Sequence, residues 1–325
     1  MADQIPVNVI TGFLGSGKTT LLGRMLQSPG FARTAVIVNE FGEIGLDHEL
    51  IEMSDESLVQ LTTGCLCCAL RGDVAETLLE LVARRDAGRV VAFERVVIET
   101  SGLADPAPIL HALMADAAVA ARFVPGAVLT VVDAVHGAAA LAAHPEARRQ
   151  VAMADRIVLS KTDLTAAGDA LTRLVAALNP TAGTGTTVEP GLDGWLLDAP
   201  VRALREVATE ARHTDGIGTA VILRERPIPG VALALLLQAL AAHAGARLMR
   251  VKGLVDVEES PGRPALVHGV QHVFEPPVFL ERWPGDDRRT RLVVIGQNIP
   301  RHWPSRLLDA IEDEVRDEAA RRLHA

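Results

Sequence analysis

The fold of this chain is decided by the stretch GFLGSGKT at residues 12–19. The stretch fits the pattern G-x-x-x-x-G-K-[ST], follows the apolar run VNVI at residues 7–10 and precedes a run with helical spacing at residues 19–26. An ordinary glycine-rich turn is the alternative interpretation, and the strand–turn–helix context argues against it. The sequence therefore predicts a P-loop, a segment whose backbone wraps nucleotide phosphates.

The P-loop pattern gives each of its residues a predicted task. Its glycines let backbone amide groups approach the phosphates, and the N-terminus of the following helix adds positive potential. Lys18 is predicted to reach the β- and γ-phosphates, and the Thr19 hydroxyl is predicted to bind Mg²⁺. The predicted phosphate-binding residues are Gly12, Gly15, Ser16, Gly17, Lys18, Thr19 and Thr20.

Short β-branched runs alternate with helical segments as far as about residue 180. Further strands are predicted at residues 35–38, 95–100, 128–134 and 156–160. Helices are predicted at residues 19–26, 73–85, 106–114, 145–154 and 167–178. This alternation predicts an α/β fold, a P-loop NTPase domain over residues 1–205 with a mostly parallel sheet and helices on both faces. The Gly, Thr and Pro clusters at residues 180–200 predict irregular structure that closes the domain.

The pattern changes in the last third of the chain. It predicts a strand at residues 219–226, a helix at residues 231–243, strands at residues 247–257, 265–274 and 291–299, and a last helix at residues 304–323. Three strands in succession without helices between them imply antiparallel pairing. We therefore expect a smaller α+β domain with an antiparallel sheet over residues 217–325.

The stretch ETSG at residues 99–102 ends the predicted strand at residues 95–100. P-loop enzymes carry an acidic Mg²⁺ partner and a glycine amide facing the γ-phosphate at such a position. Glu99 is therefore predicted to support Mg²⁺ or the attacking water, and Gly102 to contact the γ-phosphate. The alternative is a helix N-cap formed by Ser101 beside an incidental glutamate.

The stretch SKTD at residues 160–163 follows the strand RIVL and resembles the N-K-x-D motif of guanine specificity. Asp163 is predicted to accept hydrogen bonds from guanine, and the stem of Lys161 to lie over the base. Lysine is otherwise scarce, with only Lys18, Lys161 and Lys252 among 32 basic residues. Ser160 replaces the asparagine of the motif, which weakens the expected support for the loop. A plain strand-ending turn is the alternative.

All three cysteines of the chain, Cys65, Cys67 and Cys68, fall within one short stretch, GCLCC. Clustered thiolates select ions such as Zn²⁺, Co²⁺ or Cu⁺, and three ligands leave one position of a tetrahedral site open. A redox C-x-x-C pair and inert packing are the alternatives. Because no other cysteine exists in the chain, the clustering argues against a disulfide scaffold.

Three further residues are weaker candidates for the metal sites. Glu40 and Glu43 belong to the stretch NEFGE at residues 39–43, where a switch loop would contact Mg²⁺ or the second metal, or where both carboxylates are simply solvated. His213 stands in a polar segment at the predicted domain junction. The ten histidines of the chain are dispersed, with no histidine-rich tract that would store ions.

Composition excludes several classes of protein. The formal net charge is −9 and no stretch is rich in both basic and aromatic residues, so we expect no nucleic-acid partner. No uninterrupted run of 18 apolar residues and no N-terminal signal sequence is present, so we expect a cytoplasmic protein with no membrane partner.

With TGFLGSGKTTLL, NEFGE, GCLCC, ETSGLADP and SKTD in this order, the chain resembles the CobW-like family of metal-chaperone GTPases. The runs VKGLVDV, GVQHVF and RLVVIGQNI resemble that family's C-terminal domain. The resemblance implies GTP and Mg²⁺ at the P-loop, Zn²⁺ or Co²⁺ at the C-x-C-C motif, and delivery of the ion to a client metalloprotein. No glutamine or arginine stands out as a catalytic group, so unassisted hydrolysis should be slow, and the client or a homodimer partner would supply what is missing.

Two other functional classes remain open at this point. A metal sensor or storage module would bind the ion without nucleotide turnover. A P-loop kinase acting on a small metabolite would explain the phosphate site without the cysteines.

The guanine-specificity motif yields the first testable prediction. GTP should bind roughly tenfold or more tightly than ATP, because adenine leaves the Asp163 carboxylate without a matching pair of donors. Asp163→Ala should remove much of this preference while the protein stays folded. Calorimetric titration of both nucleotides measures the preference, and equal affinities for the wild-type protein would contradict the guanine assignment.

Overall fold

The computed structural model describes residues 4–38, 72–187 and 216–323. The chain divides into two compact units, Met1–Val175 with Ala182–Pro200, and Ala176–Thr181 with Val201–Ala325. The predicted domain boundary between residues 205 and 217 falls mostly outside the described residues, and it stays a prediction.

The first unit is built on a parallel sheet with the strand order β2-β3-β1-β4-β5-β6. Its strands pair in parallel throughout, so their carboxyl ends meet at one edge. The strands are β1 (Ile5–Thr11), β2 (Thr34–Val38), β3 (Arg95–Glu99), β4 (Phe123–Asp133), β5 (Arg156–Ser160) and β6 (Gly183–Thr186).

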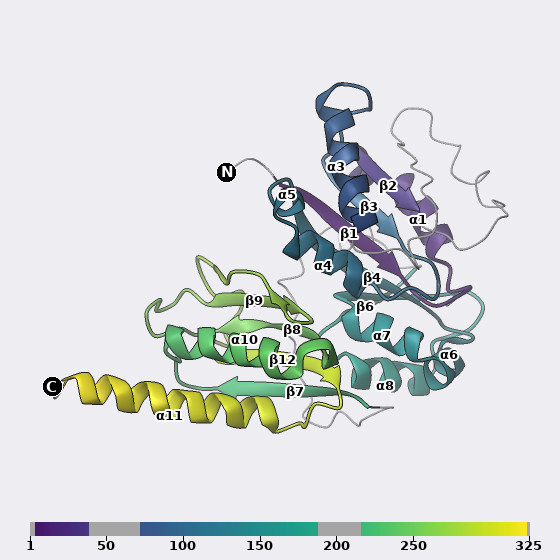
Figure 1. Ribbon diagram of the computed structural model, residues 1–325. Helices are drawn as coiled ribbons and strands as arrows, with labels where there is room; N and C mark the ends of the chain where they lie inside the picture. Colours follow the sequence, from purple (N-terminus) through teal and green to yellow (C-terminus); the bar gives the residue numbers. More distant parts are fainter. Residues whose placement is uncertain (1–3, 39–71, 188–215, 324–325) are drawn as a thin grey trace. The chain divides into compact units, whose positions relative to one another are not determined.

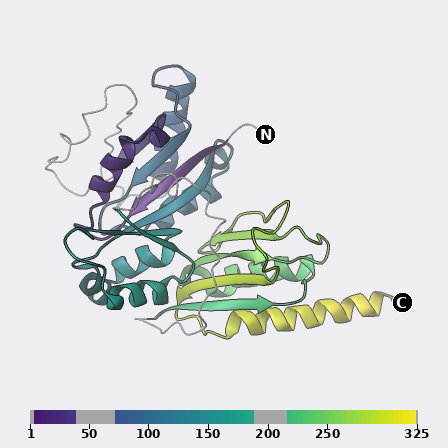
Figure 2. The same cartoon turned by 180° about the vertical axis from the view of Figure 1, so that it is seen from behind.

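Helices cover both faces of this sheet, as the two views in Figures 1 and 2 show. One core cluster joins Leu21, Leu22 and Met25 of α1 to buried residues of the strands, and α4 and α7 contact β4. The helices of this unit are α1 (Lys18–Leu26), η1 (Pro29–Phe31), α3 (Gly72–Asp86), α4 (Ala107–Ala115), α5 (Ala117–Ala120), α6 (Gly137–Ala143) and α7 (Pro145–Met153), together with α8 (Asp169–Leu178) as far as Val175.

The predicted strands and helices of this half are confirmed to within one or two residues at most ends. The expectation of irregular structure at residues 180–200 is wrong in part, because β6 pairs with β5 along Gly183–Thr186. Its sequence, GTGT, has no apolar alternation, and the strand is held by backbone hydrogen bonding at the sheet edge. The short helices α5 and α6 are additions that the sequence did not predict.

The second unit contains an antiparallel sheet with the order β10-β9-β8-β12-β7, and β11 pairs with β9. The predicted antiparallel pairing is confirmed, since β8 pairs with both β9 and β12, and β12 pairs with β7. The strands are β7 (Ile217–Arg224), β8 (Leu248–Val255), β9 (Ala265–Val270), β10 (Val273–Phe274), β11 (Val278–Phe279) and β12 (Thr290–Gln297).

Two helices, α10 (Gly230–Ala244) and α11 (Trp303–Leu323), share one core cluster with this sheet. Leu233, Leu236 and Leu240 of α10 are buried in that cluster. Within the described residues, one span, Gly230–Arg247, is long and apolar enough to cross a membrane, with a mean hydropathy of 1.3. The buried leucines explain this composition, because a helix packed on a sheet also needs an apolar face.

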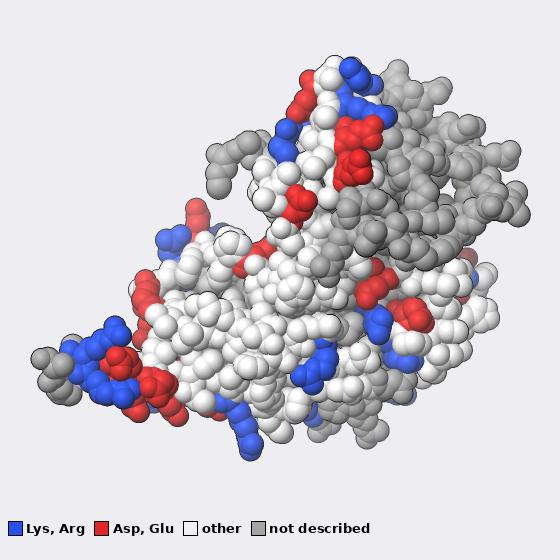
Figure 3. All heavy atoms as spheres, in the orientation of Figure 1, with Lys and Arg blue, Asp and Glu red and all other residues white. Residues whose placement is uncertain are grey.

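The long helix α11 is tied to the second unit at its beginning. Arg224 of β7 contacts Asp309 at 2.5 Å and Glu312 at 3.1 Å, and its guanidinium also donates to the hydroxyl of Ser305. Further along, acidic and basic side chains are interspersed on the exposed end of α11 (Figure 3). The first half of this helix is therefore held by packing and ion pairs together.

The core of the second unit gives a matched pair of variants on one helix. Leu236→Ala should lower the free energy of unfolding by about 2–5 kcal/mol, because Leu236 is 1% exposed and its removal leaves a cavity. Leu235→Ala should lower the free energy of unfolding by much less, because Leu235 is 41% exposed. Denaturant titration followed by tryptophan fluorescence measures both, since Trp303 packs against this core. Equal losses for the two variants would contradict the packing.

Candidate functional site

The parallel sheet brings three sequence motifs to one edge. The P-loop follows β1 in the centre, ETSG follows β3 on one side, and SKTD follows β5 beyond β4 on the other. Ligands of open α/β sheets bind at this edge, outside the carboxyl ends of the strands. The motifs that the sequence separates by up to about 150 residues thus share one region of the first unit.

The P-loop is a tight bend that tolerates no side chain at its start. Gly12 has a φ of 146°, and a Cβ atom there would lie 2.3 Å from the backbone oxygen of Val131. Lys18 donates from Nζ to the backbone oxygens of Gly12 at 3.0 Å and Phe13 at 3.4 Å. The lysine ammonium therefore lies within the bend, where the motif places it for phosphate binding.

The hydroxyl of Thr19 donates to Oε1 of Glu99 at 2.7 Å. Glu99 is 1% exposed at the end of β3, so a carboxylate and a hydroxyl oxygen meet at the base of the P-loop. Next to them, the hydroxyl of Thr100 donates to that of Thr11 at 2.9 Å and links the ends of β3 and β1. Hydroxyl and carboxylate oxygens are the ligands that Mg²⁺ prefers, so this pair fits the predicted ion.

The loop after β3 packs directly on the P-loop. A Cβ atom at Gly102 would lie 2.8 Å from both the backbone nitrogen and the Cα of Leu14, so only glycine fits there. The turn continues with a hydrogen bond from the backbone N–H of Ala104 to the oxygen of Ser101 at 3.2 Å. The predicted γ-phosphate loop and the P-loop are therefore in contact.

Ser160 supports the P-loop, contrary to the expectation that serine weakens it. Its hydroxyl donates to the backbone oxygen of Ser16 at 2.6 Å, and Ser160 is 5% exposed. The shorter side chain suffices because the end of β5 lies close to the P-loop, with the Ser160 Cβ 3.8 Å from the Cβ position of Gly17. The loop predicted to bind the base is thus linked to the loop predicted to bind phosphate.

Asp133, which the sequence did not single out, holds the predicted specificity lysine. Nζ of Lys161 contacts Oδ2 of Asp133 at 2.7 Å, while Oδ1 accepts from the backbone N–H groups of Val135 at 2.7 Å and His136 at 3.2 Å. Burial by itself would raise the pKa of Asp133, but these hydrogen bonds and the lysine charge lower it below its ordinary value of 3.8. Asp163 is exposed on the same loop.

The signal for Asp133 is present in the sequence. It is the acidic residue at the carboxyl end of a predicted strand, and β4 neighbours both the P-loop strand and the SKTD strand. Only the strand order, however, makes it a neighbour of Lys161.

The metal candidates Cys65, Cys67, Cys68, Glu40 and Glu43 lie outside the described residues, as does His213. In the parts of the chain that the structure describes, no group of three or more His, Cys, Asp or Glu side chains is arranged to hold a metal ion. Their predicted roles therefore stay predictions. Thr20, by contrast, is described, and it is exposed in the first turn of α1.

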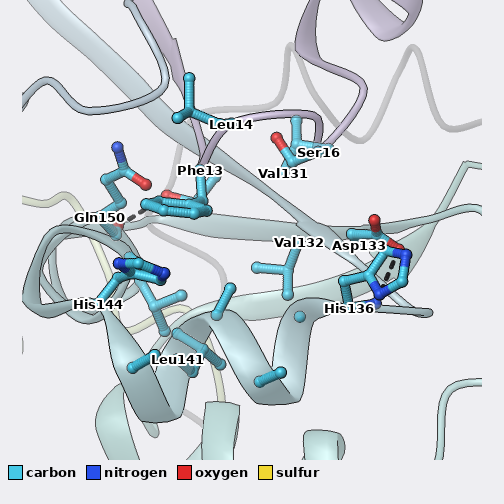
Figure 4. Close-up of a pocket in the computed structure, with 17 residues that line it drawn as sticks. Phe13, Leu14, Ser16, Val131, Val132, Asp133, His136, Leu141, His144 and Gln150 are labelled. Atoms are coloured by element: carbon cyan, nitrogen blue, oxygen red, sulfur yellow. Dashed lines mark hydrogen bonds between the residues drawn. The ribbon is translucent and has the colours of Figure 1, made fainter.

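A cavity of about 300 Å³ lies beside the P-loop, between the end of β4 and the helices α6 and α7 (Figure 4). The rings of Phe13 and His144 stack at one side of it, with centroids 4.4 Å apart. Of the predicted phosphate-binding residues, Ser16 lines the cavity, whereas Lys18 and Thr19 do not. The cavity therefore borders the phosphate-binding bend and does not reach Lys18 or Thr19.

Gln150, on α7, forms one wall of this cavity and was also not predicted. Its Nε2 donates to the backbone oxygens of Gly102 at 3.1 Å and Ala104 at 3.0 Å, and its own backbone oxygen accepts from the hydroxyl of Thr130 at 2.8 Å. No sequence motif contains this residue, so only the packing of α7 reveals it.

Comparison with protein families gives a match to each half of the chain. Residues 6–185 match the family described as CobW/HypB/UreG, nucleotide-binding domain. Residues 217–312 match the Cobalamin synthesis protein cobW C-terminal domain.

Individual relatives match over almost the whole chain. The zinc chaperone YjiA of Escherichia coli is 32% identical over 307 residues, covering 92% of this chain and 96% of the relative. The zinc chaperone CobW of Pseudomonas aeruginosa is 35% identical, covering 91% of this chain and 88% of the relative. The crystal structure of Zn(II)-bound YjiA GTPase from E. coli matches with a TM-score of 0.71 and 29% identity, covering 95% of this chain and 99% of that chain.

The ion pair between Lys161 and Asp133 gives a prediction on stability and pH. Asp133→Asn should lower the free energy of unfolding at pH 7 by about 1–2 kcal/mol, a small effect because the Lys161 side chain is 35% exposed. Folding lowers the pKa of Asp133, so the ionised carboxylate stabilises the folded protein. This stabilisation is fully present above the ordinary carboxyl pKa, and it is lost as the pH falls through the lower pKa that Asp133 has in the folded protein.

Denaturant titration of both proteins without nucleotide, from pH 7 down to about 3, measures this difference. The exposed Asp163→Asn on the same loop is the control and should change stability little. A gap between the wild-type protein and Asp133→Asn that grows toward acid would contradict the assignment.

Proposed function

Because this chain belongs to the CobW/HypB/UreG family of nucleotide-binding proteins, we propose that it is a GTP-hydrolysing metallochaperone. In this function it binds Zn²⁺ or Co²⁺ and delivers the ion to a client metalloprotein. The relatives named as zinc chaperones, each matching about nine-tenths of the chain, support the cargo and the role.

The observation that carries the proposal is the 2.7 Å contact between the Thr19 hydroxyl and Glu99. The two oxygens would hold Mg²⁺, which neutralises charge on the phosphates when it is bound. Lys18 would bind the β- and γ-phosphates through its ammonium group. Glu99 would then orient Mg²⁺ or the attacking water, and Gly102 would present its backbone amide to the γ-phosphate.

Guanine selection would fall to the loop after β5. Asp163 is exposed and free to accept from a base, and Lys161 extends from the same loop with its ammonium on Asp133. This arrangement would keep the lysine stem beside the base while its charge is neutralised. A kinase acting on a small metabolite would need no such pair.

The cargo site would be the three thiolates of Cys65, Cys67 and Cys68. The GCLCC stretch lies between the NEFGE stretch and β3 in the sequence, and both of these segments are predicted to rearrange when the γ-phosphate leaves. A loop tethered in this way would change when the phosphate leaves. Ion affinity and nucleotide state would therefore be coupled.

Three further predictions belong to the same proposal. The client metalloprotein would receive the ion and, alone or with a second copy of the chain in a homodimer, would supply the missing catalytic group. The protein would work in the cytoplasm. It would bind neither nucleic acid nor membrane, in keeping with the formal net charge of −9.

Zinc and cobalt affinities across nucleotide states test the proposal. Chelator competition should show tighter binding with Mg-GTP than with Mg-GDP, by a factor of roughly 5–150 as in typical allosteric pairs. Linkage requires that the ion tighten GTP binding by the same factor. Values that agree within about twofold would instead favour a metal sensor or storage module.

Two variants separate the sites in this experiment. The triple variant Cys65→Ser, Cys67→Ser, Cys68→Ser should lose tight Zn²⁺ binding and keep GTP binding. Lys18→Ala should abolish turnover. If the triple variant kept tight zinc binding, the cargo site would lie elsewhere, with His213 the first candidate.

A further inference from the structure

Gln150 has a buried side-chain amide whose nitrogen donates two hydrogen bonds to one loop. The side chain is 1% exposed, and Nε2 donates to the backbone oxygens of Gly102 and Ala104 at 3.1 and 3.0 Å. These contacts fix the orientation of the amide, because the reverse orientation would place its oxygen against two carbonyl oxygens. The amide therefore joins α7 to the loop that follows β3.

The same loop has its other contact with the P-loop, through Gly102 on Leu14. Leu14 and Gln150 both line the cavity of about 300 Å³ beside the P-loop. Part of the space between α7 and the P-loop is therefore a cavity that packed side chains do not fill. The two hydrogen bonds of Gln150 hold the loop where close packing does not.

The direction of these bonds sets the direction of neighbouring groups. In a trans peptide the N–H points opposite to the carbonyl, and the described residues contain no cis peptide. With the carbonyl oxygens of Gly102 and Ala104 turned toward Gln150, the N–H groups of Leu103 and Asp105 are turned away from α7. One side chain thus orients two peptide groups in the loop that carries the predicted γ-phosphate contact.

Gln150 is itself held firmly. Its backbone oxygen accepts from the hydroxyl of Thr130 on β4 at 2.8 Å, and Thr130 is 1% exposed. The path from β4 through α7 to the loop therefore consists of buried hydrogen bonds.

We propose that Gln150 is a positioning residue that fixes the peptide groups of the loop at residues 100–105 in the arrangement that distinguishes GTP from GDP. It acts through the loop and does not touch the nucleotide. This inference rests on the proposed GTPase function.

Three variants test it. Gln150→Met keeps the length of the side chain and removes both donors. Gln150→Glu keeps the shape; its ionised carboxylate cannot donate, but its protonated form can donate once. Arg149→Met, at the neighbouring exposed position of α7, is the control and should behave as the wild-type protein.

The measurements are kcat and KM for GTP, and the ratio of GTP to GDP affinity. Gln150→Met should lower kcat/KM at least about tenfold, mainly through kcat, which corresponds to about 1.4 kcal/mol of transition-state stabilisation. It should also reduce the ratio of GTP to GDP affinity several-fold. If Gln150 had a purely structural role, the variant would bind GTP and GDP more weakly by the same factor, and the ratio of their affinities would not change.

The pH profile of Gln150→Glu, divided by that of the wild-type protein from pH 8.5 to 5.5, gives the second readout. Burial and two facing carbonyl oxygens should raise the pKa of the introduced glutamate, so relative kcat/KM should recover toward acid as the donor returns. A flat relative profile would overturn the proposal, and so would wild-type kinetics and affinities in Gln150→Met. Because this readout uses Gln150→Glu and the wild-type protein alone, it decides the question even if Gln150→Met fails to fold.

The outcome for the wild-type protein separates this inference from the function on which it rests. If the wild-type protein hydrolysed no GTP, the proposed function would fail, and the ratio of GTP to GDP affinity in the variants would still decide the role of Gln150. If it hydrolysed GTP and the variants matched it, only the inference would fail.

Discussion

The hydrogen bond between Thr19 and Glu99 depends on one constraint, the parallel pairing of β1 with β3. In that register Ile10 lies opposite Glu99, so the end of β3 stands beside the start of the P-loop. A shift by one residue would turn the Glu99 side chain to the other face of the sheet. The predicted phosphate site therefore depends on a buried sheet, packed on both faces, whose register is strongly specified.

From this constraint the rest of the nucleotide edge follows. Ser160 anchors the P-loop from β5, Asp133 holds Lys161 at the end of β4, and Gln150 holds the loop after β3. Each is a buried polar side chain, and each forms at least one hydrogen bond to a neighbouring loop. Buried polar groups require such partners, so the loops are arranged by the need to satisfy them.

The sequence predicted those parts of the site that lie within a short stretch of chain. Lys18, Thr19 and Glu99 could be proposed from the sequence because their motifs are local and their strand context is apolar and regular. Asp133 and Gln150 were not, because their partners are 28 and 46–48 residues away and depend on strand order and helix packing. Among the elements, β6 was missed because a strand with the sequence GTGT carries no hydrophobic period.

The long helix α11 has an uneven attachment to the rest of the second unit. Its residues from Trp303 to Val315 pack against the core, while Arg321 and Arg322 pair with glutamates of the same helix. Exposed ion pairs within one helix are weakened by salt. The last turns of a helix fray when nothing packs against them. The backbone amides near this end should therefore exchange with solvent in an ionic-strength-dependent way, while those around Leu308 remain protected.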